Sequence, residues 1–329
     1  MRSFFRSMLM YRITGEMPAA LLDHAALNAA LNTKPSGDPA SQQLNRYGFD
    51  EIYPRRLLTP SDREEPTFTD EEPEVPERAR FVGRGIVVIR ARMTKRNMPG
   101  GAIKRMVEAK VREIENAQMR KVYKKEREQI KDEVIQAHMP HALVTDTYTY
   151  ALIDLEAKLI LVESSAPARA EDLLSVLRDA LGSLPVRPIG TKQSPTEILT
   201  RWVRDGNCTN GFHLLDGAYL EDAGEAPGKV GLANVDIGGE EMEQHLAHGR
   251  LVKKLALAYE DAFAFMLTDK LIISKLRWDD IYEEQADKDG GEDYAGQLDA
   301  SYLIQGLKYR DFVADLLEAF GGEELPVGL

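Results

Sequence analysis

The stretch between Pro99 and His138 constrains the fold more than any other part of the chain, because it predicts two helices that cannot belong to a closed core. Ile103, Val107 and Val111 recur at every fourth residue and place a single narrow apolar stripe along the first helix. A basic joint follows, and the inward residues of the second helix are expected to be Ile130, Val134 and Ala137. Lys and Arg occupy the other faces of both helices. We therefore expect the pair to project from the body of the protein.

The same part of the chain is strongly basic although the whole chain is acidic. The sequence has 42 Lys and Arg against 54 Asp and Glu, a formal net charge of -12. Fifteen Lys or Arg and five Glu lie between Arg84 and Lys131, so this stretch carries +10 and the remainder -22. Helices in water usually balance their cations with acids four residues away. The threefold excess of cations therefore predicts a polyanionic partner.

The residues around these cations indicate how a polyanion would be held. Tyr123 is the only aromatic residue between Pro99 and His138, so stacking on single-stranded bases has little support. No recognition-helix signature favours reading of base edges. Gly100 and Gly101 either offer backbone N–H groups to a phosphate or form an ordinary turn. We expect salt-sensitive phosphate contacts that ignore sequence. The candidate DNA-contacting residues are Arg90, Arg92, Lys95, Arg96, Lys104, Arg105, Lys121, Lys124 and Lys125.

Elsewhere the periodicity predicts an α+β protein with antiparallel sheets. Alternating apolar residues mark strands, and spacings of three and four mark helices. The expected strands are Phe4 to Ile13, Ile86 to Lys95, Thr147 to Leu155, Leu159 to Glu163, Leu184 to Ile189, Leu251 to Tyr259, Ala262 to Leu267 and Leu271 to Trp278. Helices are expected over Pro18 to Asn32, from Pro167, from Pro195 with a Ser194–Glu197 capping box, and over Ala300 to Phe320 after a polar connector, Asp279 to Glu292.

These elements suggest three parts of the chain. Residues 1–98 form an N-terminal α+β part of a central body and include an acidic loop at 61–77, which contains three prolines. Residues 99–139 form the projecting helical tip. Residues 140–329 complete the central body with an α+β section, an antiparallel meander and the terminal helix.

The residue patterns typical of enzymes are missing, so we expect no catalytic activity, no cofactor and no metal. Neither the phosphate-binding loop Gly-x-x-x-x-Gly-Lys-[Ser/Thr] nor the dinucleotide fingerprint Gly-x-Gly-x-x-Gly occurs. His245 and His248 share a helix face without a His-Glu-x-x-His pattern. The carboxylates at 279–280 and 283–284 are expected to be a solvated charge run rather than a two-metal site. Cys208 has no adjacent His, and we expect an inert thiol.

Membrane association is not expected either. No run approaches 18 consecutive apolar residues, and Arg6 and Arg12 interrupt the N-terminal apolar segment too early for a signal peptide. The single cysteine excludes an internal disulfide. We expect a soluble, cytoplasmic protein.

Six blocks, in the same order along nearly the whole chain, resemble the RdgC recombination-associated proteins of bacteria. No block alone is diagnostic, but together they make a specific match. The blocks are residues 4–13 (FFRSMLMYRI), 103–139 (the two basic helices), 181–186 (LGSLPV), 200–216 (TRWVRDGNCTNGFHLLD), 249–257 (GRLVKKLAL) and 316–323 (LLEAFGGE).

The resemblance implies a non-enzymatic, nucleoid-associated homodimer. In this family a ring with a positive lumen encircles double-stranded DNA without sequence preference and restrains RecA-promoted strand exchange in recombination and replication-fork repair. A closed ring would hide a basic lining inside an acidic exterior. By family position, His141 and Leu143 are the implied dimer contacts.

Two departures from the family pattern bear on this implication. The family commonly has Pro-Arg-Ala-Phe after the second helix, and its Phe helps to close a dimer contact; this chain has Pro-His-Ala-Leu at 140–143. A polar Lys-Lys-Gln-like patch that can face the lumen is replaced by Ala-Asn-Val at 233–235. DNA binding would then depend more heavily on residues 84–131.

Two other classes of function stay open. A protein-interaction scaffold would use the acidic body to bind a basic partner, or RecA directly, without encircling DNA. A divalent-metal nuclease is the third reading, and nicking of supercoiled plasmid with Mg²⁺ or Mn²⁺ would reveal it.

Overall fold

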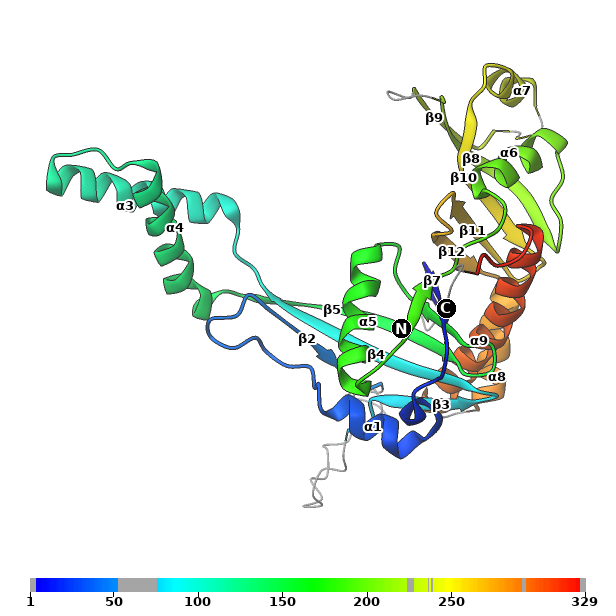
Figure 1. Ribbon diagram of the computed structural model, residues 1–329, viewed down its shortest axis with the longest axis horizontal. Coiled ribbons are helices and arrows are strands. Elements are labelled where there is room, and N and C mark those ends of the chain that lie inside the picture. Colours follow the sequence, from blue (N-terminus) through cyan, green and yellow to red (C-terminus); the bar gives the residue numbers. More distant parts are fainter. Residues whose placement is uncertain are drawn as a thin grey trace. The chain divides into compact units, whose positions relative to one another are not determined.

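The computed structural model describes residues 4–52, 76–223, 228–235, 237, 239–291 and 294–325, and the statements below concern these residues. They form two antiparallel sheets and eight α-helices, α1 and α3 to α9 (Figure 1), which confirms the α+β class. The chain divides into two compact units. The first comprises Met1–Leu31, Glu51–Arg90 and Thr149–Leu329, and the second Asn32–Asp50 and Ala91–Tyr148. Residues 61–75 of the expected acidic loop lie outside the described residues.

One sheet is built around two long strands, β4 (Ile86–Arg96) and β5 (Val144–Asp154), each of which runs from one unit into the other. The strand order is β2-β4-β5-β6-β1-β7, and β3 also pairs with β4. The short strands are β1 (Leu9–Ile13), β2 (Asn45–Phe49), β3 (Ala79–Gly83), β6 (Leu159–Val162) and β7 (Val186–Pro188). The β-branched run at 86–89 is fully buried, as its composition predicted.

The other sheet lies in the first unit and has the order β12-β11-β10-β8-β9. The expected meander is confirmed as β10 (Leu251–Tyr259), β11 (Phe263–Thr268) and β12 (Ile273–Trp278), with alternate residues of β11 buried. Strands β8 (Phe212–Glu221) and β9 (Lys229–Ala233) were not predicted.

The N-terminal strand is shorter than expected because its first residues pair with the other sheet. The N–H of Met8 donates to the Ile273 carbonyl at 2.9 Å, and the N–H of Leu276 donates to the Arg6 carbonyl at 2.9 Å. Phe4 and Phe5 are buried there, and β1 begins only at Leu9. The segment therefore covers the outer edge of β12.

The helices of the first unit differ from the expectation in three places. The helix expected over residues 18–32 is a 3₁₀ turn, η1 (Ala19–Leu22), followed by α1 (His24–Asn32). The polar connector after β12 is a helix, α8 (Asp280–Gly290), because the Asp279 carboxylate accepts from the Ile281 N–H at 3.0 Å and caps it. The Ser194 side chain makes no capping hydrogen bond, so the expected capping box does not form. The remaining helices are α5 (Pro167–Leu181), α6 (Pro195–Asp205), α7 (Glu240–Ala247) and α9 (Tyr294–Ala319).

An aromatic cluster between α9 and the β8–β12 sheet forms the centre of the first unit's core. Phe263 contacts the rings of Trp278 and Phe312 at centroid distances of 4.8 and 5.3 Å. The α9 helix also approaches β4 closely at Gly306, where a Cβ would stand 2.8 Å from the Ile86 side chain. Only glycine permits this contact.

The second unit contains β2, parts of β4 and β5, and the two basic helices. These are α3 (Gly100–Gln118) and α4 (Lys124–His138), and a short 3₁₀ turn, η2 (Met139–His141), follows them. Figure 1 shows α3 and α4 side by side. Their shared core confirms the predicted stripes and consists of Ile103, Val107, Val111, Ile130 and Val134. Ala137 was expected to face inward but is exposed.

Candidate nucleic-acid interface

Six of the nine predicted contact residues present their cations to solvent. Lys104 and Arg105 lie on α3, Lys121 in the joint, and Lys124 and Lys125 at the start of α4; Lys95 lies near the end of β4. All six side chains are exposed, and no described ion pair includes them. They belong to one compact unit, so their positive charge is concentrated in that part of the chain.

The other cations of the helix pair include three that hold the two helices together. Lys110 on α3 contacts Glu133 on α4 at 3.5 Å, and Arg127 on α4 contacts Glu108 on α3 at 3.6 Å. Arg120 pairs with Glu126 across the joint. Three acidic side chains of the two helices are thus paired with cations that stabilise the hairpin itself. The six exposed cations take part in none of these ion pairs.

Arg90, Arg92 and Arg96 occupy a different environment, because each is engaged inside the protein. Arg90 is buried and lies 5.8 Å from the centre of the Tyr150 ring. Arg92 lies 3.9 Å from Asp50 and 3.7 Å from Asp146. The sequence pattern could not show this, because the partners are distant in the chain.

Arg96 is the clearest structural arginine of the three. Its guanidinium donates to the backbone carbonyls of Gln43, Pro140 and Pro39, at 3.2, 3.3 and 3.0 Å, and only 9% of the residue is exposed. A planar five-donor group suits this three-carbonyl pocket. Arg96 therefore ties the turn-rich segment before β2 to the end of α4.

The two residues implied as dimer contacts are both exposed. Leu143 has 81% of its surface exposed, while its carbonyl accepts from the Asn97 N–H at 2.6 Å and fixes the backbone. His141 ends the 3₁₀ turn η2. Both side chains are therefore accessible for the dimer contact that the resemblance implies.

The second unit also carries an apolar groove of about 640 Å³ beside α3 and α4. Its floor contains Ile103 and Val107 of α3 and Ile135 of α4, and Leu44 and Met98 complete it. Lys104, Lys124, Arg127 and Lys131 surround it, with Glu128. The sequence did not reveal this groove, because Leu44 comes from a distant turn-rich segment that carries no periodic pattern.

The Ala-Asn-Val segment at 233–235 lies at the end of β9. Ala233 and Asn234 are exposed, and Asn234 has a left-handed backbone with φ of 56°. No cation stands at 233–235, so this position adds nothing to the positive charge of the molecule.

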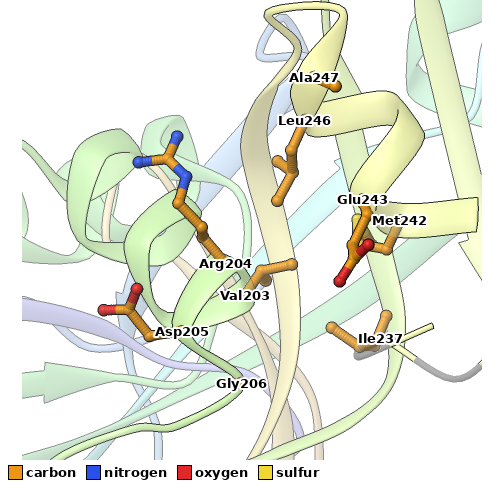
Figure 2. Close-up of a pocket in the computed structure, with 9 residues that line it drawn as sticks. All are labelled: Val203, Arg204, Asp205, Gly206, Ile237, Met242, Glu243, Leu246 and Ala247. Carbon is orange, nitrogen blue, oxygen red and sulfur yellow. The ribbon is translucent and has the colours of Figure 1, made fainter. Parts of the chain in front are cut away.

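A pocket of about 490 Å³ in the first unit lies between α6 and α7 (Figure 2). Val203, Met242 and Leu246 supply apolar walls, while Glu243 points down the gap toward Ile237. The nine residues that line it include no His, Cys, Ser, Thr or Lys. Asp205 and Glu243 are the two carboxylates of this lining, which holds none of the hydroxyl, thiol or imidazole groups with which a carboxylate commonly forms a nucleophile–base pair.

Several side chains that were considered above for catalysis or metal binding are buried, cap a helix or pair with a neighbouring side chain. Burial raises the pKa of the Cys208 thiol to about 12, which keeps it protonated and unreactive. Asp279 caps α8, and Glu284 pairs with Lys288 at 3.6 Å. His245 shares a hydrogen bond of 2.6 Å with Arg250. Among the described residues, no group of three or more His, Cys, Asp or Glu is arranged to hold a metal ion.

None of the helices in the described ranges combines the length and the apolar composition needed to cross a bilayer.

The fold and the site together define an α+β protein whose second unit carries a basic helical hairpin, with exposed cations that form no ion pair among the described residues. The family model described as "Putative exonuclease, RdgC" matches residues 73–323. Proteins named "Recombination-associated protein RdgC" from Pseudomonas paraeruginosa (strain DSM 24068 / PA7) and Pseudomonas aeruginosa (strain LESB58) are each 42% identical over 326 residues. One from Pseudomonas putida (strain GB-1) is 41% identical over the same length. Each match covers 99% of this chain and 100% of the relative. The chain belongs to the RdgC family.

Proposed function

We propose that this protein binds double-stranded DNA through its phosphates, without sequence preference, as a ring-shaped homodimer in the bacterial nucleoid. The observation that carries the proposal is the set of exposed cations on the second unit of a chain whose net charge is -12. An acidic protein repels DNA over most of its surface, so a concentrated basic face fixes where DNA can lie. The relatives' name, recombination-associated, agrees with DNA as the partner.

The nine predicted phosphate contacts fall into two groups, one with exposed side chains and one whose side chains contact other protein groups. Lys95, Lys104, Arg105, Lys121, Lys124 and Lys125 are exposed and would bind phosphates as point charges or forks. Arg90, Arg92 and Arg96 were proposed as contacts from the sequence, but their side chains already hold protein groups. They would contribute long-range potential and hold the structure around β4, and direct phosphate contact would require them to leave these partners.

Closure of the ring would use Leu143 and the apolar groove. A protein that encircles DNA needs an interface whose two sides match, and the second unit supplies both an exposed Leu143 and a groove lined by Ile103, Val107 and Ile135. Leu143 of one protomer would enter the groove of the other, reciprocally. Leucine fills such a groove less completely than the family's phenylalanine, so the contact would be weaker than the family's usual one.

Restraint of RecA-promoted strand exchange follows from occupancy of the duplex. A ring around the homologous duplex blocks the nucleoprotein filament from pairing with it, without any contact between the two proteins. A scaffold that binds RecA directly is the alternative. A variant that has lost DNA binding separates them, because it should lose the inhibition only in the first case.

Fluorescence anisotropy of a labelled random duplex of about three helical turns, titrated across salt, tests the proposal. Each neutralised phosphate contributes about -0.9 to the slope of log K against log salt. A steep slope, equal for unrelated sequences, is expected. Absence of binding at low salt would overturn DNA binding and favour the scaffold.

The description of the family model as an exonuclease supports one second candidate function. End-labelled linear duplex incubated with Mg²⁺ or Mn²⁺ distinguishes the two. We expect the label to stay with full-length DNA, and progressive loss of terminal nucleotides would establish the nuclease instead.

A further inference from the structure

We propose that the joint between α3 and α4, residues 119–123, is a wedge that inserts Met119 and Tyr123 into the minor groove of bound duplex DNA and opens a base step. The inference rests on the proposed function, since it specifies what the basic hairpin does once it is on DNA. Its starting observation is exposure: Met119 and Tyr123 have 90% and 77% of their surfaces in solvent. Both flank the joint, with Met119 after α3 and Tyr123 before α4.

The backbone of the joint is shaped to present these side chains. Met119 ends α3 in the left-handed region, with φ of 49° and ψ of 36°, a place where glycine or asparagine is usual. A long apolar side chain there is both conformationally costly and fully hydrated. Costly conformations that persist in a folded protein tend to mark functional positions.

The joint is also held firmly, which a wedge requires. The Val122 N–H donates to the Glu115 carboxylate at 3.0 Å, and Val122 packs on the hairpin core. The Arg120 guanidinium donates to Gln118 at 2.7 Å and to Glu126 at 2.5 Å. Alternate residues of the joint are thus anchored, while Met119 and Tyr123 face outward on a fixed frame.

The charge around the joint indicates which kind of molecule it contacts. Lys121, Lys124 and Lys125 are exposed around the two apolar side chains, and the neighbouring Glu126 is paired with Arg120. A second copy of this joint would carry the same cations and would be repelled. The joint combines exposed cations with exposed apolar side chains. Duplex DNA suits both, because it is a polyanion whose apolar base stack is accessible through a groove. Methionine is among the residues that wedge between base steps from the minor groove, and a tyrosine ring can stack on an exposed base.

The wedge is tested with a duplex that carries 2-aminopurine at a central TA step, whose fluorescence rises when the base unstacks. TA steps open most readily, so they should report first. Wild-type protein is expected to raise the fluorescence, and Met119→Ala/Tyr123→Ala to abolish the rise with affinity lowered about tenfold and the salt slope unchanged. The matched control is Met106→Ala/Tyr148→Ala, which removes the same residue types at 38% and 37% exposure elsewhere in the second unit.

The possible outcomes separate the wedge from the proposed function. Anisotropy that shows wild-type binding without a fluorescence rise overturns the wedge and leaves DNA binding intact. No binding by anisotropy overturns the proposed function as well. A double variant that keeps the fluorescence rise but loses self-association, or loses binding to phosphatidylglycerol vesicles, overturns the wedge by assigning the side chains to a second copy or to a membrane.

Discussion

Arg120 and Glu126 form a two-pronged ion pair across the joint between α3 and α4: the two terminal nitrogens of the guanidinium donate to the two carboxylate oxygens at 2.7 and 2.5 Å. The hydrogen bonds lower the pKa of Glu126 and raise the pKa of Arg120, so the pair stays charged across the working pH range. One acid of the basic hairpin is thereby neutralised by a cation six residues before it. The lysines on either side are left to act on a partner.

Glu126→Gln should strengthen binding to any duplex. The change removes a negative charge beside Lys124 and Lys125 and releases Arg120 to contact a phosphate, so the salt slope should steepen by up to about 0.9. Anisotropy across salt measures both effects. Glu241→Gln, an exposed change on α7 of the first unit, serves as the control. Weaker binding by Glu126→Gln would mean that the pair matters more as a brace of the joint than as a source of negative charge.

Reversal of the joint lysines should have the opposite effect. Lys121→Glu/Lys124→Glu/Lys125→Glu is expected to weaken binding to all sequences alike and to reduce the steepness of the salt slope by about 2 to 3, since three phosphate contacts are lost. The comparison is Lys192→Glu/Lys270→Glu/Lys288→Glu, which changes the net charge equally at exposed positions of the first unit. Equal losses in the two triple variants would show that only net charge matters, and would remove the joint from the interface.

Arg96→Lys should reveal a structural role. Lysine keeps the positive charge but cannot reach the carbonyls of Pro39, Gln43 and Pro140 together, so the free energy of unfolding should fall by about 1–3 kcal/mol. Urea denaturation measures it, with the exposed Arg105→Lys as the control. DNA affinity below the unfolding transition should be unchanged. Normal stability with reduced affinity would instead establish Arg96 as a phosphate contact.

Local patterns in the sequence were sufficient to predict the helical hairpin, but they could not predict the environment of the neighbouring arginines. The four-residue spacing of Ile103, Val107 and Val111 determines which face of α3 is buried, wherever the helix lies. The burial of Arg96 depends on carbonyls at Pro39 and Pro140, more than forty residues away in either direction. No local pattern carries that information, and a basic strand end therefore resembled a free basic surface.

The missed elements have weak apolar patterns for identifiable reasons. In β8, the register with β10 shifts between Leu214 and Ala218, and this irregularity interrupts the alternation that would mark a strand. In α8, Ala286 is the only buried residue, so the helix has no apolar stripe, and its cap Asp279 was read as part of a charge run. The family resemblance singled out Leu143, and only the structure revealed the apolar groove beside α3 and α4.

Glu163 should make stability depend on pH in a direction opposite to that of most carboxylates. Burial raises its pKa from 4.5 to about 7, although the Arg6 N–H partly offsets this. Between these values the unfolded chain releases a proton that the folded protein retains, so stability falls as pH rises from 4.5 to 7, by about 3 kcal/mol at most, and is flat above. Glutamine at position 163 cannot ionise. The free energy of unfolding of Glu163→Gln, measured by urea denaturation, should therefore rise relative to that of wild type between pH 5 and 8. Glu241→Gln should show the same pH dependence of unfolding free energy as wild type. If Glu163→Gln also shows that pH dependence, the raised pKa of Glu163 is refuted.

Leu143→Asp should open the proposed ring. Burial of a leucine side chain contributes about 1.5–3 kcal/mol, and the reciprocal interface contains two such contacts. Their loss should therefore raise the dissociation constant about 100- to 10,000-fold. A closed ring is linked topologically to circular DNA but slides from linear ends, so wild-type protein should survive a high-salt wash on nicked circular plasmid and not on the linearised form. Leu143→Asp should be washed from both, whereas Leu143→Phe should be retained at least as well as wild type. Leu22→Asp, at 60% exposure in the first unit, controls for the added charge. Retention of both Leu143→Asp and Leu143→Lys on circles would show that the ring closes through other residues, because a carboxylate could pair with the cations around the groove whereas a lysine would be repelled by them.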